Sequence, residues 1–391
     1  ALRLRADAPL HSLGLDSLAI ARLSSRLADR FGVSLAPRTL FALPTLAALE
    51  AALFGGNAVA RQAVLRGRVV SWEAEAEAVL AEIDQEIEME AAAAAEADVE
   101  TDVEAAAEAG DGGDGGDAVL LTGGSGFLGA FLIRSLLHNP PWQPPQRCEG
   151  SAARLICIVR AEDDAAALRR LRAVLRTYEL DSDAAVREWL EVPGSVLAGD
   201  VTRPHLGLSA ATNASLVAQL RCVVHCAAVV SSALPFESLR LPNAIGTCRV
   251  MRLAASARAD LVHISTLGLL DAGAPESMQV ETRGLPARSG YAQSKYVAER
   301  VVASGVGRPW WPAGRRAMVV RPGVLCGDFA SGASNEKDAV SMMLCGMVLE
   351  GVTCTADATS PLPRWYNLCP VDSAAAAIVA SVSQSSSRGA C

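Results

Sequence analysis

The stretch Val119-Leu-Leu-Thr-Gly123-Gly-Ser-Gly126-Phe-Leu-Gly129 decides the fold of this chain. Its apolar start is typical of a buried strand, and residues 130–137 after the glycines are typical of a helix. Gly123 permits a tight turn, Gly126 lets the backbone approach a pyrophosphate, and Gly129 lets the helix pack on the sheet. A structural glycine turn is the alternative, but the strand–turn–helix context favours a dinucleotide site at the helix N-terminus. We expect contacts from Gly123, Gly126, Phe127, Leu128 and Gly129.

Short apolar runs continue after this motif and predict further strands. With the first, they are Ala118–Thr122, Leu155–Val159, Ser195–Ala198, Arg221–Cys226, Leu261–Ser265 and Met318–Arg321. Helical stretches separate most of them, which is the pattern of a doubly wound parallel sheet. We therefore predict an α/β, NAD(P)-binding Rossmann-like fold for residues 118–391, with the Pro-rich segment 139–152 as a surface loop.

The residue that ends the second predicted strand bears on the choice of cofactor. An acid at this place would bind a ribose 2′-hydroxyl, whereas an Arg suits a 2′-phosphate. The residue is Arg160, which predicts NADPH rather than NADH. An ordinary surface Arg in an Arg-rich chain is the alternative.

A Tyr–Lys pair follows in the segment Gly290-Tyr291-Ala-Gln-Ser-Lys295. Positions i and i+4 of a helix share a face, so both polar tips can reach one substrate. Only two of the 35 basic residues are lysine, which suggests that this one is needed as lysine. A compact ammonium shifts the pKa of its neighbours in a way that Arg does poorly.

The composition is that of a globular chain with two or three domains, because 51% of its 391 residues are hydrophobic. No apolar run is long enough to span a membrane, and the N-terminus does not resemble a signal peptide. The ten cysteines form no Cys-x-x-Cys pair, which argues against a metal site. Buried reduced thiols fit a reducing compartment, so we expect a cytoplasmic protein.

The acidic charge is concentrated between Glu73 and Asp117, where 17 acidic residues occur without a Lys or Arg. The rest of the chain therefore has a net charge of +9, although the whole chain has −8. The Arg residues are dispersed, which argues against nucleic-acid binding. We predict an acidic Ala/Gly-rich linker at 55–117, in which residues 73–90 form a helix with an apolar stripe of Val79, Ile83 and Ile87.

Residues 1–54 are expected to form a small all-α domain, incomplete at its N-terminal side. Leu13-Gly-Leu-Asp16-Ser17-Leu18 begins a helix, and Leu40-Phe-Ala-Leu-Pro44-Thr45 follows. Asp16 or Ser17 is suited to be a helix cap. The pair of motifs nevertheless resembles acyl and peptidyl carrier domains, which implies that Ser17 carries 4′-phosphopantetheine, attached by a phosphopantetheinyl transferase.

The stretch 118–391 resembles the extended short-chain dehydrogenase/reductases. More narrowly, it is similar to the thioester reductase domains that end some polyketide synthases, nonribosomal peptide synthetases and carboxylic acid reductases. The resemblance rests on motifs in family order: Thr122–Gly129, Ile158–Ala161, Gly199–Val201, His225–Ala228, Asn243–Thr247, Ile264–Thr266, Gly290–Lys295, Arg321–Gly323 and Pro370–Asp372.

This resemblance implies that Thr266, Tyr291 and Lys295 are the catalytic residues. Hydride addition to a carbonyl builds an oxyanion, which Tyr291 can protonate as a general acid. We expect the Lys295 ammonium to lower the phenol's pKa and Lys295 also to hold the cofactor, while Thr266 hydrogen-bonds the same oxygen. Ser265 is the neighbour most easily confused with Thr266.

The resemblance also implies further cofactor contacts and a more passive histidine. Asp200 is expected near the adenine, Ala227 along the cofactor, Pro322 near the nicotinamide, and Arg170 beside Arg160. His225, in an apolar strand, is expected to be packed rather than catalytic.

These expectations together describe NADPH-dependent reductive release of an acyl thioester from the chain's own carrier domain, to an aldehyde or on to an alcohol. Upstream synthase modules are the implied partners, and the chain is expected to be a fragment that is also incomplete at its C-terminal side. The alternatives are a carboxylic acid or aminoadipate reductase fragment and a non-catalytic NADPH-binding scaffold. A sugar epimerase or dehydratase shares the catalytic set but gives no reason for Ser17.

Overall fold

The computed structural model describes residues 23, 71–96, 116–140, 154–231, 234–270, 289–336, 338–351 and 367–386. The predicted carrier domain lies outside these ranges apart from Leu23, so Ser17 is not described. The predicted surface loop at 139–152 lies outside them from residue 141 onward.

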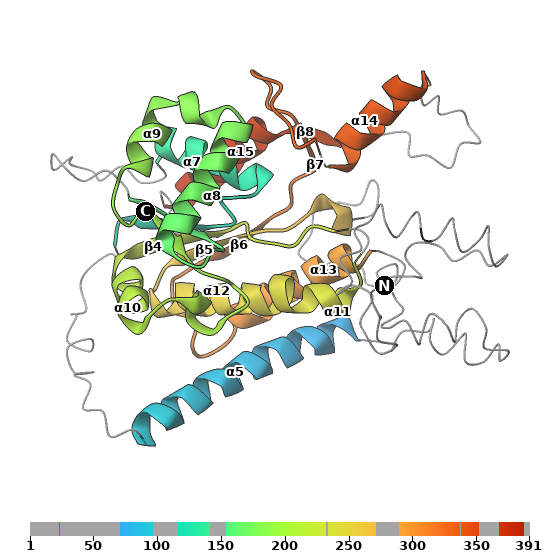
Figure 1. The fold of residues 1–391 in the computed structure, drawn as a ribbon. Coiled ribbons are helices and arrows are strands. Elements are labelled where there is room, and N and C mark those ends of the chain that lie inside the picture. The colour runs from blue at the N-terminus through green and yellow to red at the C-terminus, as the bar shows by residue number, and fades with distance from the viewer. Residues whose placement is uncertain are drawn as a thin grey trace, which may run out of the picture.

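A six-stranded parallel sheet forms the centre of the described chain, in the order β3-β2-β1-β4-β5-β6 (Figure 1). The strands are β1 (Ala118–Thr122), β2 (Leu155–Val159), β3 (Val196–Ala198), β4 (Leu220–His225), β5 (Asp260–Ile264) and β6 (Ala317–Val320). Each predicted strand is present, with its ends displaced by no more than one residue. The crossover from β3 back to β4 on the other side of β1 is the doubly wound topology, so the predicted fold is confirmed.

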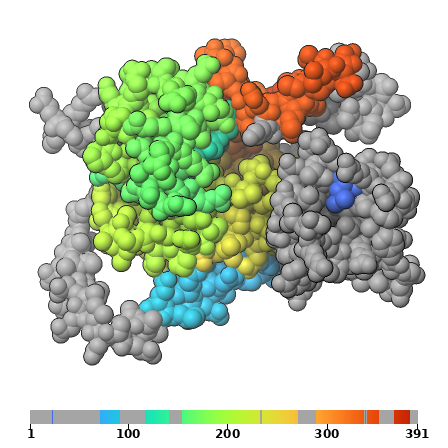
Figure 2. Space-filling view, viewed as in Figure 1, coloured from blue at the N-terminus to red at the C-terminus, as the bar shows by residue number. Residues whose placement is uncertain are grey.

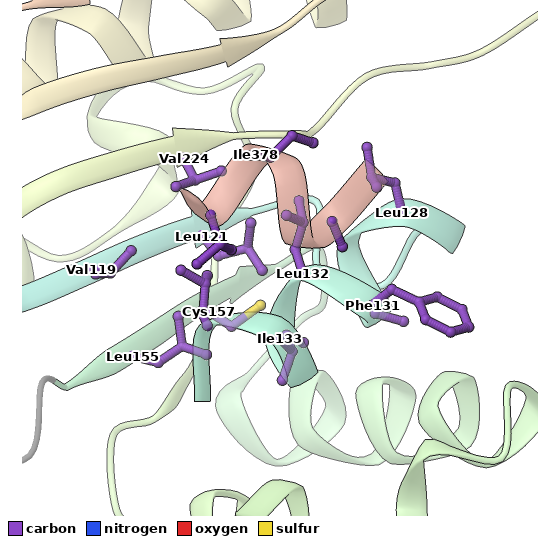
Figure 3. Packing of buried hydrophobic residues seen from close by; sticks show 14 of the residues in the cluster. Val119, Leu121, Leu128, Phe131, Leu132, Ile133, Leu155, Cys157, Val224 and Ile378 are labelled. Atoms are coloured by element: carbon purple, nitrogen blue, oxygen red, sulfur yellow. The ribbon is translucent and has the colours of Figure 1, made fainter. Parts of the chain in front are cut away.

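Helices cover both faces of this sheet (Figure 1). On one face lie α7 (Phe127–His138), α8 (Asp164–Thr177), α9 (Ala184–Leu190) and α15 (Val371–Ser386). Figure 3 shows the core that they enclose, where Leu132 and Ile133 of α7 lie among Leu121, Cys157 and Ile378. The other face is covered by α10 (Ala210–Gln219), α12 (Gly246–Ser256) and α13 (Gly290–Val306).

Helix α5 (Trp72–Glu96) packs against the α13 side of the domain (Figure 1). It confirms the helix predicted for 73–90. Val79, Leu80 and Ile83 are buried in a cluster with Val297 and Val301 of α13, and Ile87 packs at the margin. Figure 2 shows the helix as a blue ridge along the lower edge of the molecule. This part of the predicted linker is therefore a docked helix and adds no flexible reach.

The acidic residues of α5 meet arginines of the domain. Arg240, in the π-helical turn η4 (Arg240–Ile245), pairs with Glu75 and with Glu82. Further pairs join Arg249 to Glu86 at 2.6 Å, Arg252 to Asp84 at 3.4 Å, and Arg308 to Glu77. The carboxylates of α5 are thus paired with arginines that belong to the positively charged remainder of the chain. Because most of these pairs are partly exposed, the apolar stripe should contribute more than they do.

We predict that Leu80→Ala destabilises the protein, because the Leu80 side chain of α5 is fully buried in the cluster between α5 and α13. The free energy of unfolding should fall by about 2–4 kcal/mol in urea titrations followed by circular dichroism. Met89→Ala on the same helix is the matched control, since Met89 is 73% exposed, and it should change stability by less than about 0.5 kcal/mol. Equal stability of the two variants would mean that α5 is not docked.

A second, two-stranded parallel sheet pairs β7 (Val324–Cys326) with β8 (Leu368–Pro370). The sequence does not predict it, because runs of three residues give no periodic signal. Helix α14 (Ala339–Glu350) follows β7 and projects away from the main body (Figure 1). After β8, α15 begins at Val371 and packs along α7. Among the helices of the described ranges, none is long and apolar enough to cross a membrane.

Candidate active site

The glycine turn after β1 has no room for side chains. Gly123 has a φ of +80°, and a Cβ there would lie 2.5 Å from the backbone nitrogen of Ala227. A Cβ on Gly129 would overlap the carbonyl oxygen of Gly123. Gly126 precedes α7, and no side chain caps the helix there. The uncapped first turn of α7 therefore presents backbone N–H groups that suit the phosphates of a dinucleotide.

Sequence reasoning missed the role of Gly124. A Cβ at this position would collide with the Sγ atom of Cys157 on β2. Gly124 is therefore a packing glycine that brings the turn close to the second strand.

Phe127 and Leu128 contribute to this turn through their backbone. The Phe127 ring packs against Phe131 at 5.6 Å and Tyr178 at 5.1 Å between ring centroids, and Leu128 is buried in the core. Any contact with a cofactor phosphate must come from their amides.

The two arginines predicted to read a 2′-phosphate lie together. Arg160 follows β2 and is exposed, and the Arg170 guanidinium donates a 2.9 Å hydrogen bond to its carbonyl oxygen. Asp200 follows β3 and accepts hydrogen bonds from the backbone and the hydroxyl of Thr202. All three residues stand after the carboxyl ends of their strands or in the helix that follows, where doubly wound folds bind nucleotides.

Ala227 and Pro322 help to build the same edge of the sheet. Ala227 follows β4 and donates its N–H to Thr122 Oγ1 at 3.4 Å, beside the glycine turn. Pro322 follows β6, and its carbonyl accepts from Leu267 N at 2.9 Å, which holds the segment after Thr266.

Thr266 stands two residues beyond the end of β5. Its Oγ1 accepts a 3.1 Å hydrogen bond from Gly268 N, so the hydroxyl hydrogen can still be donated to a substrate oxygen. Its neighbour Ser265 is buried, whereas Thr266 is partly exposed. This difference favours Thr266 over Ser265 as the residue that meets a substrate.

Tyr291 and Lys295 lie one turn apart near the start of α13. Ser289 caps this helix by accepting from Ala292 N at 3.3 Å, which sets the first turn that carries Tyr291. Lys295 is 1% exposed, and its Nζ donates to the Ile264 carbonyl at 2.6 Å and lies 3.1 Å from His263 Nε2. Burial lowers the pKa of Lys295 to about 8.

The pKa of Tyr291 departs from the expected direction. Burial, with a contribution from Cys226, raises it to about 12, whereas the expectation is that Lys295 lowers it. That expectation is wrong for this structure, because Lys295 Nζ is bonded to β5 and the phenol is poorly solvated. The raised pKa keeps Tyr291 protonated at neutral pH, which is the form that a proton donor requires.

Asn243 holds two parts of the site together. Its side chain accepts from Val229 N at 2.8 Å and donates to Val229 O and to Ser294 Oγ at 3.0 and 2.9 Å. It lies in η4, a single π-helical turn of the kind common at functional sites. Asn243 therefore ties the segment after β4 to α13, between Tyr291 and Lys295.

One further turn along α13, Glu299 forms a buried ion pair with Arg321, which follows β6. Two hydrogen bonds of 2.8 and 2.6 Å join them, and their side chains are 2% and 3% exposed. The pair locks α13 to the sheet beside the turn that carries Tyr291 and Lys295. The Arg321-Pro-Gly323 motif is visible in the sequence, but the partner of its arginine is not.

His225 is packed as predicted. It is fully buried, bonded through both ring nitrogens, and burial lowers its pKa to about 3.

Comparison with known proteins agrees with this arrangement. Residues 121–378 match the NAD-binding family described as male sterility protein. The chain belongs to this family. Residues 1–53 also match the phosphopantetheine attachment site family, which covers the predicted carrier region around Ser17.

Similar proteins include a glycine betaine reductase and a subunit of a linear gramicidin synthase. A glycine betaine reductase of Emericella nidulans is 30% identical over 85% of this chain and 24% of that protein. A linear gramicidin synthase of Brevibacillus parabrevis is 34% identical over 59% of this chain and 4% of that protein. The chain thus spans a minor part of these relatives.

Solved structures of reductase domains share the fold. The terminal R domain of the myxalamid biosynthetic pathway is 33% identical with a TM-score of 0.55, over 68% of this chain and 62% of that one. A thiolation-reductase di-domain from an archaeal nonribosomal peptide synthetase has a TM-score of 0.61 over 97% of this chain and 72% of that one. At 19% identity, the second likeness is one of fold alone.

Proposed function

We propose that the chain catalyses NADPH-dependent reduction of an acyl thioester held on its own carrier domain, with release of an aldehyde. The observation that carries this proposal is the bond from Lys295, one turn after Tyr291, to the carbonyl of Ile264, which lies two residues before Thr266 at the carboxyl end of the sheet that also holds the glycine turn. The match to the phosphopantetheine attachment site family supports a tethered substrate. Related proteins named as reductases and peptide synthetases support the reaction class.

The glycine turn fits a nicotinamide dinucleotide. A side chain on Gly123 would clash with the backbone of Ala227, and one on Gly129 would clash with the Gly123 carbonyl, so only glycine allows the tight turn that brings the start of α7 to the phosphates. When bound, that cofactor supplies the hydride. Gly126 and the first amides of α7 would hold its pyrophosphate, Arg160 and Arg170 its 2′-phosphate, and Asp200, Ala227 and Pro322 would line its other parts.

The catalytic side chains act on the charge that develops at the substrate's carbonyl oxygen. Tyr291, kept protonated by burial, donates its proton there. Thr266 donates a second hydrogen bond to the same oxygen. Lys295 contributes a positive charge one turn away and, in the family, holds the nicotinamide ribose.

The ordered helix α5 suggests how the carrier meets this site. Its first residue, Trp72, packs edge-on against Phe236 at 5.2 Å, and Glu73 accepts from Tyr296 Oη at 2.8 Å on α13, five residues after Tyr291. Residues 55–71 would then tether a carrier domain at 1–54, with a contour of at most about 55–60 Å. We propose 1–54 as carrier, 55–71 as tether, and α5 as part of a reductase unit that continues to 391.

The loss of activity on the alkaline side of the pH–rate profile should reflect deprotonation of the Lys295 ammonium. Its ammonium is the required form, it is present below a pKa of about 8, and it is lost as the pH rises through that value. We therefore expect kcat/KM, which reports the pKa values of the free enzyme, to fall about tenfold per pH unit above about 8. A plateau extending past pH 10 in a series of buffers at constant ionic strength would show that Lys295 charge is not needed.

NADPH preference should depend on the two adjacent arginines. Arg160→Ser together with Arg170→Ser should raise KM for NADPH by about 10- to 100-fold, the value of a lost charge-assisted hydrogen bond. KM for NADH should hardly change, because NADH lacks the 2′-phosphate. Arg169→Ser, the exposed neighbour on α8, is the control. Equal effects on both cofactors would contradict the assignment.

The reaction itself is tested with an acyl-pantetheine thioester supplied in solution with NADPH. Loss of absorbance at the reduced nicotinamide band, with aldehyde and free thiol detected by mass spectrometry, supports the proposal. Cofactor binding without turnover would favour the scaffold alternative.

A further inference from the structure

Three polar side chains stand abreast across the carboxyl end of the sheet, behind the catalytic turn. Thr122 ends β1, His225 ends β4, and His263 is the next-to-last residue of β5. Thr122 is the register partner of His225, and His225 is the register partner of His263. Register partners of neighbouring parallel strands point to the same face, and the two rings lie 5.3 Å apart. The three side chains therefore form one buried polar row.

The hydrogen-bond network assigns the tautomer of His225. Thr247 Oγ1 donates to the Asn243 carbonyl at 2.6 Å, so it accepts from His225 Nε2–H at 3.0 Å. Nδ1 of His225 then accepts from the Thr122 hydroxyl at 2.8 Å. Both ring nitrogens are satisfied, and His225 has no hydrogen bond to spare for Lys295.

His263 differs from His225 in facing the catalytic lysine. Its Nε2 lies 3.1 Å from Lys295 Nζ, and its Nδ1 has no partner among the described residues. Burial and the charge of Lys295 lower the pKa of His263 well below its usual value, so the ring is neutral. A neutral ring next to an ammonium accepts with Nε2 and carries its proton on Nδ1.

We propose that His263 is a positioning residue for Lys295. Its Nε2 and the Ile264 carbonyl are two acceptors on β5 that bind two of the three ammonium hydrogens. The third N–H is left for the reaction site beside Tyr291. This proposal rests on the proposed function for its catalytic consequence, but the contact itself is independent of it.

Loss of His263 should change how Lys295 titrates. The groups that act on this pair are the neutral His225 of β4, Cys226 in the segment after it, Glu299 from α13, and Arg321 through Glu299. None of them replaces the acceptor that Nε2 provides. The buried ammonium would lose a hydrogen bond that its neutral form does not need, so its pKa should fall.

The test compares His263→Leu with His263→Gln, whose Oε1 can take the place of Nε2. His263→Leu should lower kcat by about 10- to 100-fold and move the alkaline limb down by about one pH unit, as expected for one hydrogen bond to a charged group. His263→Gln should restore most of both. His225→Leu is the matched control, because His225 is equally buried but has no hydrogen bond to Lys295. The activity that this variant retains should fall at the same alkaline pH as that of the wild type.

A second readout needs no turnover. The chain has only two lysines, Lys295 and Lys337, so NMR of protein labelled at the lysine ¹³Cε gives two signals that Lys337→Arg assigns. In the full chain the Lys295 signal should titrate near pH 8, and at lower pH in His263→Leu. An unchanged Lys295 titration in that variant, or an equal change in His225→Leu, would overturn the proposal. Inactive wild-type protein with the expected titration shift would refute the proposed function and leave the positioning role standing.

Discussion

Replacing Tyr291 by Phe is expected to reduce kcat for thioester reduction by about 10²- to 10⁴-fold, the contribution of a well-placed general acid. The substitution removes one oxygen from a partly buried side chain and leaves the ring that packs at the start of α13. Because Phe cannot supply a proton, the charge that forms on the substrate oxygen is stabilised only by the hydrogen bond from Thr266 and the more distant charge of Lys295. NADPH affinity should stay within about threefold, since no charge–charge contact is removed.

Tyr296→Phe is the control for this prediction. Tyr296 lies on the same helix, but its hydroxyl donates to Glu73 of α5 at 2.8 Å and faces away from the catalytic turn. The control should keep wild-type kcat and lose some thermal stability. Turnover by Tyr291→Phe at the rate of Tyr296→Phe would remove Tyr291 from the mechanism.

Breaking the Glu299–Arg321 pair is expected to produce the largest loss of stability. Glu299→Gln conserves shape but leaves a guanidinium, 3% exposed, without its carboxylate. Removing one partner of a buried ion pair costs about 3–5 kcal/mol, because the remaining charge is uncompensated. Urea titration of the folded chain measures this change as a lower midpoint.

Glu191→Gln is the matched substitution at an exposed pair. Glu191 is 74% exposed and accepts from Arg172 at 2.8 Å, so its loss should cost less than about 1 kcal/mol. A Glu299→Leu, Arg321→Leu double variant should recover part of the loss, since neither charge of the pair is then left buried without its partner. If Glu299→Gln were no more damaging than Glu191→Gln, the pair would not be holding α13 to the sheet.

The main sheet was predictable because its strands are continuous apolar runs bounded by turn residues. Ala118–Thr122 and Leu155–Val159 are predicted to the residue, since burial on both faces leaves an unbroken hydrophobic signal. The pair β7 and β8 was not predictable in the same way, because three residues show no period and their partners are distant in the chain.

The site residues also divide into those with a local sequence signal and those that depend on distant partners. Gly123 stands out as part of a glycine motif, and Tyr291 and Lys295 stand out as a pair at the spacing of one helical turn. The partners that set their behaviour do not: His263 meets Lys295 only because β5 lies under α13, and Asn243 meets Ser294 only through a π-helical turn. The direction of the Tyr291 pKa was mispredicted for that reason, since spacing gives the nearest charge but not the degree of burial.

Helix α5 was predictable as a helix but not as a docked one. Its thin apolar stripe and dense acidic charge are equally typical of a solvated linker helix. Its docking depends on partners more than 150 residues later in the chain: α13 covers the apolar stripe, and arginines on α12 and η4 pair with the acids of α5. Only the folded domain brings that complement together.

The measurement that tests the central claim most directly is a single turnover on the loaded chain. A phosphopantetheinyl transferase and an acyl-coenzyme A would place an acyl-pantetheinyl arm on Ser17, and NADPH would then be added in excess. We expect one equivalent or more of NADPH to be consumed, with aldehyde released and a free carrier thiol. Ser17→Ala treated alike should consume none, and Tyr291→Phe should consume it about 10²- to 10⁴-fold more slowly. A loaded wild-type chain that retains its acyl group while NADPH is bound would contradict the proposed reaction.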